Sequence, residues 1–329
     1  MPDFKKKYKT CLQSLLFFVI LAGIFFTISV KTEGVLLEND RLVPIRNKNI
    51  YRIQREPANS IDVIVLGDSL SYSAVSPMVL WREHGFTSYV CGQSGQKIQE
   101  TENMLKTVLE NQSPKLVILE TDVMFRGGTG MKSFNEAIEE VLNYYIPVFR
   151  GHDSWKSLVM DKEYEEKNYK GFAFRCTIQP YEKGNYMQKT EQKEEISNTI
   201  LTHMDTIMNL CAEYGADLLL VATPSPLNYN YARHNSLAAY AKEHDLSFLD
   251  LNLLLDKLGI DWKTDTRDKG DHLNLLGAEK VSKYLGEYLA GEYDLPDHRG
   301  KIRFRDWTNE AAVYTHNAER HMKDMGKVV

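Results

Sequence analysis

The sequence predicts an α/β protein with a central parallel sheet, preceded by one membrane-spanning helix. Short apolar runs typical of buried strands alternate with helical segments, which is the pattern of repeated strand–helix–strand units. Residues 11–30 carry no charge, and at 1.5 Å per residue their length matches a bilayer core of roughly 30 Å. With 43% hydrophobic and 26% charged residues, the chain has the composition of a folded globular protein.

The N-terminal segment carries an orientation signal. Basic residues precede the apolar run, at Lys5, Lys6, Lys7 and Lys9. The positive-inside rule therefore predicts a cytoplasmic tail over 1–10, a signal anchor over 11–30 and an extracellular remainder in a single-pass protein of the cell membrane. A cleaved signal peptide is the alternative, but no small-x-small cleavage pattern follows the apolar core. Residues 31–57 are predicted to form a polar, basic connector.

The elements of the sheet follow from apolar runs bounded by turn residues. Runs such as Val63-Ile-Val-Leu66 lack polar alternation, which is typical of strands buried on both faces. The same reasoning predicts strands at 63–66, 89–91, 116–119, 217–222 and 248–251, and helices at 70–74, 77–84, 98–111 and 276–289. An open α/β sheet places its chemistry at the carboxyl ends of its strands, so polar residues directly after these runs are candidate site residues.

Two regions do not fit the alternation. Residues 126–193 form an insertion in the domain predicted over 58–295. The insertion is rich in aromatic and polar residues, among them Phe149, His152, Trp155, Lys156, Tyr164, Tyr169, Phe172, Phe174, Tyr181 and Tyr186. These aromatics either fill a small satellite core or form a carbohydrate-facing wall over the carboxyl edge of the sheet. The charged tail over 296–329 contains Trp307. The tail either docks on the domain or is frayed, and the sequence does not choose between the two.

Charge and cysteine content exclude several classes of protein. The net charge is −5 and the pI is about 6.0, which gives no sign of nucleic-acid binding. The cysteines are widely spaced, without a C-x-x-C pair or metal-ligand spacing, at Cys11, Cys91, Cys176 and Cys211. Cys11 lies at the membrane boundary, and we predict that the other three are small buried hydrophobes. We predict no metal and no cofactor. Few cysteines outside a membrane fit a Gram-positive bacterial surface.

Two short motifs, far apart in the sequence, carry the candidate chemistry. Gly67-Asp68-Ser69-Leu70 follows the first strand, and Ser69 there lies among the free N–H groups of a helix N-terminus. That environment suits a serine nucleophile, although Ser69 as an ordinary N-cap is the simpler alternative. The second motif is Asp271-His272-Leu273-Asn274, followed by Gly277-Ala278, and it supplies a histidine near the end of the domain.

Together these motifs resemble the first and last blocks of the SGNH/GDSL hydrolase superfamily. The resemblance covers roughly residues 62–289 and implies a flavodoxin-like three-layer sandwich. It also implies a serine esterase or O-acyltransferase in which Ser69 attacks a carbonyl, His272 removes the serine proton and an acid orients His272. The family places that acid three residues before the histidine, where this chain has Lys269. We favour Asp268, because a turn brings positions i and i+4 together, over Asp271.

The resemblance also implies an oxyanion hole, where this chain departs from the family. The family uses the N–H of the nucleophile, a glycine N–H and an asparagine side chain. Gly92 is the first choice for the glycine and Gly95 the alternative, since both follow a strand end. In place of the asparagine motif the chain has Glu120-Thr121-Asp122, and an ionised Asp122 cannot donate a hydrogen bond. Asn235 and Gln96 are the candidate substitutes, and a polar group at the surface or one that only supports other site residues is the simpler alternative for each.

The predicted topology narrows the resemblance further. A basic tail, one membrane helix and an external domain of this type resemble bacterial cell-envelope O-acylation proteins, including the D-alanyl lipoteichoic acid transfer and alginate O-acetylation proteins. This resemblance implies an acylated glycan or polymer as substrate and a multi-pass membrane O-acyltransferase as a possible partner. The acyl group and the acceptor, water or a sugar hydroxyl, stay open. A non-catalytic envelope module that binds a glycan or such a partner is the alternative function.

Overall fold

The computed structural model describes residues 2–127, 131–151 and 168–326. The chain divides into two compact units, Met1–Arg52 with Gly130–Tyr164, and Ile53–Thr129 with Glu165–Val329. The second unit contains the sheet and both sequence motifs, and its fold is of the predicted α/β class. Its boundaries differ from those predicted. The unit begins before residue 58 and extends beyond 295, and the 126–193 insertion is divided between the two units.

The second unit is built on a five-stranded sheet in which every strand pair is parallel, in the order β2-β1-β3-β4-β5. Its strands are β1 (Val63–Leu66), β2 (Ser88–Val90), β3 (Leu116–Glu120), β4 (Asp217–Ala222) and β5 (Ser247–Asp250). All five lie within one residue of the predicted ranges. The connections leave β1 and β3 in opposite directions, so the two strands flank the switch point where such sheets bind ligands.

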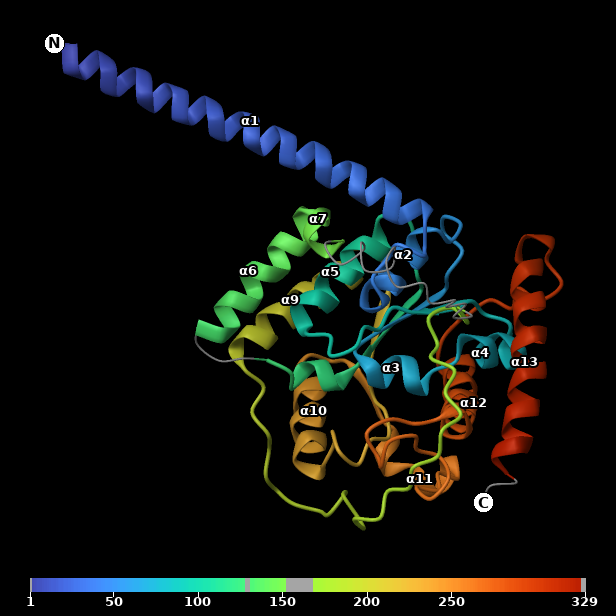
Figure 1. Ribbon diagram of the computed structural model, residues 1–329. Helices are drawn as coiled ribbons and strands as arrows, with labels where there is room; N and C mark the ends of the chain where they lie inside the picture. Colours follow the sequence, from blue (N-terminus) through green and yellow to red (C-terminus); the bar gives the residue numbers. More distant parts are fainter. Residues whose placement is uncertain (1, 128–130, 152–167, 327–329) are drawn as a thin grey trace. The chain divides into compact units, whose positions relative to one another are not determined.

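Helices cover both faces of the sheet (Figure 1). They include α3 (Ser69–Ala74), α4 (Pro77–His84), α5 (Ile98–Leu109), α9 (Asn198–Glu213), α10 (Tyr231–Glu243) and α12 (Leu275–Glu292). Strand side chains alternate between the two faces. Val63, Val65, Leu80, Val281 and Leu285 belong to one buried cluster between the sheet and the α4–α12 layer, while α5 and α9 pack together on the opposite face. Neither α9 nor α10 was predicted from the sequence.

Short helices and the chain's last helix complete this unit. These elements are η2 (Thr121–Met124), η3 (Leu251–Leu253), α11 (Leu255–Leu258), η4 (Ile302–Phe304) and α13 (Arg305–Met325). The tail therefore docks on the domain: α13 packs on α4, with the rings of Trp307 and Trp81 5.4 Å apart. Tyr314 on α13 is fully buried, and its hydroxyl donates a hydrogen bond to Glu279 Oε1 at 2.8 Å.

The aromatic residues of 168–193 mostly fill satellite cores. Tyr169, Phe172 and Phe174 pack around Tyr314, with ring centroids 5.0 to 6.1 Å apart. Tyr181 and Tyr186 pack against Trp262 in a second group. Only Tyr186 of these lines the cavity described below. The satellite-core interpretation holds for these residues, whereas His152, Trp155, Lys156 and Tyr164 lie outside the described residues.

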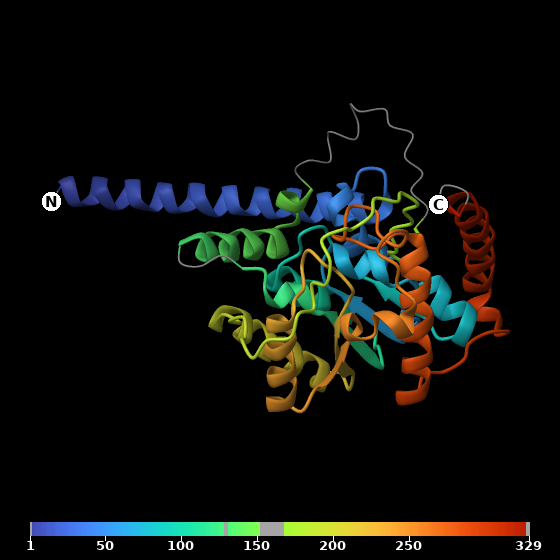
Figure 2. The ribbon, with the colours of Figure 1, turned by 90° about the horizontal axis from the view of Figure 1, so that it is seen from below.

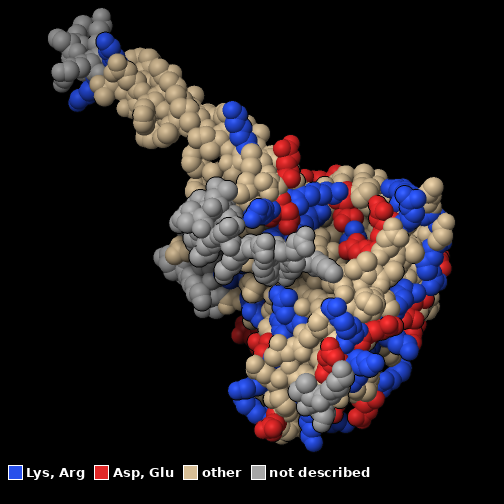
Figure 3. Space-filling view, turned by 45° about the vertical axis from the view of Figure 1, so that its right-hand side comes forward, with Lys and Arg blue, Asp and Glu red and all other residues tan. Residues whose placement is uncertain are grey.

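The first unit contains the N-terminal helix. Its elements are α1 (Pro2–Glu38), η1 (Ile45–Asn47), α6 (Met131–Tyr145) and α7 (Pro147–Arg150), and α2 (Lys48–Gln54) lies at its boundary. Over Lys7–Glu38, α1 is long and apolar enough to cross a membrane. Figure 3 shows uncharged surface along the middle of α1. The predicted connector 31–57 is largely helical, because α1 continues without a break to Glu38.

Candidate active site

Ser69 lies at the carboxyl end of β1, where the chain turns into α3. Gly67 makes this turn with a φ of +145°, and a Cβ there would lie 2.6 Å from Glu120 Cβ, so only glycine fits. Asp68 is the N-cap of α3, since its Oδ1 accepts a hydrogen bond from the Leu70 N–H at 2.8 Å. Ser69 is therefore the first helical residue and not the cap, in the turn where a helix leaves its N–H groups unpaired.

His272 reaches Ser69 from the loop before α12. Its Nε2 lies 2.7 Å from Ser69 Oγ, although 203 positions separate the two residues. Its Nδ1 lies 2.6 Å from Asp268 Oδ2, and its backbone N–H donates to Asp268 Oδ1 at 2.6 Å. With the ring proton held on Nδ1 by the carboxylate, Nε2 faces the serine hydroxyl as a proton acceptor. The serine hydroxyl and the imidazole are thus at hydrogen-bond distance, which the roles implied by the resemblance require.

A closed loop brings Asp268 to His272. Thr266 Oγ1 accepts a hydrogen bond from the Gly270 N–H at 2.8 Å and donates one to the His272 carbonyl at 3.0 Å. Lys269, at the spacing usual for the acid, occupies the turn with a φ of +63°. The turn therefore places the residue four positions before the histidine, and not the one three before it, against the ring.

Asp271, the alternative acid, has a different main partner. Its Oδ2 lies 3.5 Å from His272 Nδ1, while its Oδ1 accepts a hydrogen bond from Asn228 Nδ2 at 2.6 Å. Burial raises the pKa of Asp268, but the side-chain and backbone hydrogen bonds from His272 outweigh burial and hold that pKa below its ordinary value. Asp268 thus stays ionised and makes the shorter contact with the ring. Its catalytic role stays a prediction.

The two carboxylates and the histidine also offer three atoms that lie within 4.8 Å of one another, as in a metal site. Both ring nitrogens of His272 already have partners, Ser69 and Asp268. The serine–histidine–aspartate contacts therefore account for this grouping without an ion.

Three carboxyl groups meet beside the nucleophile, on Asp68, Glu120 and Asp122. Burial, together with the neighbouring charge of Asp122, raises the pKa of Asp68 to about 7, against the opposing charge of Arg126. Burial also raises the pKa of Glu120, whose Oε2 accepts a hydrogen bond from the Asp122 N–H at 3.1 Å. Ser69 therefore follows directly after a buried carboxyl group whose pKa is raised to about 7.

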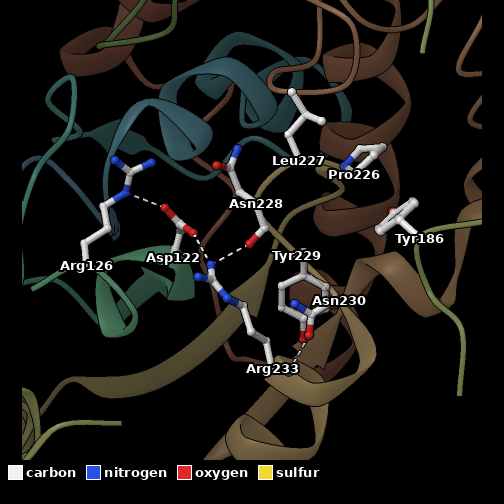
Figure 4. Close-up of a pocket in the computed structure, with 9 residues that line it drawn as sticks. All are labelled: Asp122, Arg126, Tyr186, Pro226, Leu227, Asn228, Tyr229, Asn230 and Arg233. Carbon is white, nitrogen blue, oxygen red and sulfur yellow. Dashed lines mark hydrogen bonds and ion pairs between the residues drawn. The ribbon is translucent and has the colours of Figure 1, made fainter. Parts of the chain in front are cut away.

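Two arginines partly neutralise this group. Arg126 Nε lies 2.7 Å from Asp68 Oδ2 and also contacts Asp122 Oδ2. Arg233 Nη1 lies 2.8 Å from Asp122 Oδ1 and donates to the Asn228 carbonyl at 2.5 Å. Figure 4 shows Asp122 between the two guanidinium groups. Both carboxylate oxygens of Asp122 therefore accept from arginines, and its role in the oxyanion hole or in substrate binding stays a prediction.

A cavity of about 440 Å³ opens beside these arginines (Figure 4). It is lined by Asp122, Arg126, Tyr186, Pro226, Leu227, Asn228, Tyr229, Asn230 and Arg233. Most of these side chains are polar or charged. Asn228 joins the cavity to the loop that carries His272, because its amide also donates a hydrogen bond to Asp271. The cavity thus suits a polar group.

The two glycines predicted for the oxyanion hole, Gly92 and Gly95, differ in how closely they approach the turn that carries Ser69. A Cβ on Gly92 would lie 2.2 Å from Ser71 Oγ and 2.7 Å from the Asp68 carbonyl, so the loop after β2 packs directly on the nucleophile turn. Gly95 makes no such approach, since no described heavy atom lies within 4 Å of its Cβ position. Gly92 is the better placed glycine, and its role as a donor stays a prediction.

Both candidate substitutes for the asparagine have structural partners, as their alternative interpretation expects, and the role of each in the oxyanion hole stays a prediction. Asn235 Nδ2 donates to the carbonyls of Thr190 at 2.7 Å and Gln192 at 2.8 Å, so the amide ties the 190–192 segment to α10. Gln96 is fully buried and donates to Thr101 Oγ1 at 2.9 Å. Both amides serve as structural hydrogen-bond donors.

Sequence reasoning missed Arg126, Arg233 and Asn228. Arg126 carried a weak signal, since it lies four residues after Asp122 just beyond the end of β3. Asn228 follows the carboxyl end of β4, which is also a position where site residues are expected. Arg233 lies inside α10, a helix that was not predicted, so nothing local pointed to it.

Comparisons with protein-family models and with curated proteins gave no match. Among solved structures, the chain is similar to a lipase/acylhydrolase from Enterococcus faecalis, with 13% identity over 73% of this chain and 100% of that chain, at a TM-score of 0.38. It is also similar to a GDSL-like lipase from Bacteroides thetaiotaomicron, with 12% identity over 70% of this chain and 88% of that chain, at a TM-score of 0.36. At these TM-scores the neighbours' activities are not carried over to this chain.

Proposed function

We propose that this chain is a membrane-anchored, extracellular serine esterase or O-acyltransferase acting on acyl esters of a cell-envelope polysaccharide or teichoic acid. The observation that carries the proposal is the continuous contact from Ser69 Oγ through both ring nitrogens of His272 to Asp268. Nucleophile, base and orienting acid at hydrogen-bond distance are the arrangement that activates a serine.

The chemistry follows from these contacts. Ser69 Oγ attacks the ester carbonyl carbon while His272 Nε2 takes the hydroxyl proton, and Asp268 stabilises the imidazolium that forms. His272 then returns that proton to the leaving alkoxide, which leaves an acyl group on Ser69. Water or a sugar hydroxyl, deprotonated by His272, attacks the acyl carbon. The bond from that carbon to Ser69 Oγ then breaks, and His272 returns its proton to Oγ, which regenerates the enzyme.

Arg126 is our candidate for the missing oxyanion donor. Its guanidinium contacts the carboxyl groups of Asp68 and Asp122. Asp68 lies next to the nucleophile, and Asp122 lies where the family has its asparagine motif. An arginine is always a donor, whereas Asp122 is not. A fixed positive charge near the developing oxyanion would act with the Ser69 N–H in the first turn of α3.

The cavity supports a polar acceptor. Only Pro226 and Leu227 among its lining residues are aliphatic, which is a poor match for a long acyl chain. A hydroxyl-rich polymer segment matches the amides of Asn228 and Asn230 and the arginines better. A multi-pass membrane O-acyltransferase would be a natural partner for such an anchored enzyme, as donor of the acyl group.

A fluorophosphonate probe tests the proposal, because it phosphonylates only an activated serine. We expect the full-length chain to be labelled and the Ser69→Ala and His272→Ala variants to lose labelling. Ser73→Ala is the matched control, since Ser73 is a buried hydroxyl of the same helix and has no hydrogen-bond partner among the described residues. This control should be labelled like the wild type.

The same experiment distinguishes the enzyme from the alternative function, a non-catalytic binding module. Because Asp122 replaces the expected asparagine, the chain could instead be a non-catalytic module that binds an envelope glycan or the membrane acyltransferase. A folded wild-type chain that resists labelling, with a normal circular dichroism spectrum, would favour this module over the enzyme.

A further inference from the structure

One face of α6 is apolar and exposed. Ile138, Val141, Leu142 and Tyr145 recur at three- and four-residue spacing, and they are 45, 53, 38 and 70% exposed. Glu139 lies about 100° around the helix from Ile138 and is also exposed. A helix of a soluble protein normally turns such an apolar stripe toward a core. The stripe is therefore expected to contact an apolar partner in place of water.

The neighbouring helix α7 packs on the apolar part of α1. The rings of Phe149 and Phe25 lie 5.5 Å apart, and the Val148 N–H donates to Ser29 Oγ at 3.2 Å. Ser29 is only 2% exposed. Six positions separate Phe25 from Lys31, the first charge after the apolar run, which is about 9 Å along the helix axis. Thus α7 meets α1 at a level where α1 would still contact lipid.

Polar contacts begin at the next residue of α7. Arg150 Nη1 lies 4.0 Å from Glu33 Oε1, and the Arg150 carbonyl accepts a hydrogen bond from Asn47 at 3.1 Å. The Arg150 guanidinium also lies over the ring of Tyr51. The change from the apolar contact of Phe149 to the polar contacts of Arg150 coincides with the level where α1 becomes charged. This level marks the border between lipid and water for the first unit.

We propose that α6 lies in the surface of the bilayer that α1 crosses, with its apolar stripe among the acyl chains. Only Ile146 separates the end of α6 from α7, so the border level of α7 is also that of the α6 C-terminus. Figures 1 and 2 show α7 against α1, and Figure 1 shows α6 leading away from α7. The stripe then continues the lipid-facing surface of α1 within the same unit. A depth of about 5–10 Å is usual for interfacial helices.

The charge of α6 indicates whether lipid headgroups contribute to its binding. Its polar face carries Glu139 and Glu140, so attraction to anionic headgroups does not contribute, and burial of the apolar stripe supplies the binding. The chain would thus contact the bilayer at two places, which fixes the orientation of the first unit on the membrane. This inference requires α1 to cross the membrane, but it is independent of any catalytic role of Ser69.

Tryptophan quenching tests the proposal in the full-length chain, reconstituted in phosphatidylcholine vesicles with and without brominated acyl chains. The matched variants are Ile138→Trp on the stripe and Glu139→Trp beside it, each compared with the parent chain. We expect the added emission of Ile138→Trp to be blue-shifted and quenched several-fold more by brominated lipid than that of Glu139→Trp. Tyr145→Trp, an aromatic exchange at an exposed position, repeats the test if Ile138→Trp fails to fold.

Each other outcome overturns the proposal. Equal, weak quenching of both variants with red emission would mean that the stripe faces water. Blue-shifted emission of Ile138→Trp without quenching would mean that protein covers the stripe, either the second unit or a second copy of the chain. Cover by the second unit and cover by a second copy are distinguished by diluting the protein in excess lipid, since only contact between copies is lost on dilution.

Discussion

His272 Nδ1 lies 2.6 Å from Asp268 Oδ2 and 3.5 Å from Asp271 Oδ2, so the site depends on which carboxylate holds the Nδ1 proton. We expect Asp268→Asn to lower kcat by roughly 10²–10⁴-fold, because an amide no longer stabilises the imidazolium or fixes its tautomer. Asp271→Asn should have a much smaller effect, since its main hydrogen bond comes from Asn228. Steady-state ester hydrolysis by the two variants measures the difference. A larger loss for Asp271→Asn would reverse the assignment of the acid.

Arg126 offers a second residue-level prediction. Arg126→Gln should lower kcat by about 10²-fold or more with a smaller change in KM, as expected for loss of an interaction made mainly in the transition state. Arg233→Gln is the matched control, because Arg233 also pairs with Asp122 and lines the cavity. We expect Arg233→Gln to raise KM instead. Equal effects of both variants on KM alone would assign Arg126 to substrate binding.

The buried carboxyl of Asp68 predicts a pH dependence of stability. Burial and Asp122 raise its folded-state pKa from an ordinary value near 4 to about 7. Between these values the unfolded chain releases the proton while the folded chain keeps it, so the contribution of Asp68 to stability falls as pH rises from about 4 to 7. Asp68→Asn keeps the N-cap and removes this titration.

Urea unfolding of the full-length chain in detergent, from pH 4.5 to 7.5, measures the effect. We expect Asp68→Asn to lose less stability than the wild type over this interval. Parallel pH profiles for the two chains would show that Asp68 is already ionised in the folded protein.

At the scale of elements, α13 is expected to be part of the fold of the second unit. Tyr314→Ala should lower the free energy of unfolding by on the order of 3–5 kcal/mol, because it empties a site that four aromatic or charged partners surround. Val313→Ala, at a 48% exposed position of the same helix, is the control and should change little. Urea unfolding of both variants provides the comparison. Similar stabilities would mean that α13 contributes no packing energy.

At the scale of the whole molecule, the basic tail before α1 predicts the orientation. Protease added to intact cells should digest the second unit and leave the N-terminal tail protected. Detection with a tag at each end distinguishes the two parts, and permeabilised cells supply the control in which both are digested. Protection of the second unit in intact cells would place it in the cytoplasm.

The sequence by itself determined the strands and the residues that end them. Buried parallel strands are continuous apolar runs, and this local pattern located all five of them within one residue. Ser69 and His272 were identifiable because each lies in a short motif beside a strand or helix boundary. The aspartate at i−4 from the histidine was predictable for the same reason, since a local turn sets its position.

Only the tertiary structure decided what surrounds this pair. Arg233 meets Asp122 across 111 positions, and Asn228 meets Asp271 across 43, so no local pattern records either contact. The partners of Asn235 were likewise not predictable, because a polar side chain on a helix bonds whichever carbonyls the fold brings near, here those of Thr190 and Gln192. The docking of α13 depended likewise on the surface that α4 offers to Trp307, which exists only after the sheet has folded.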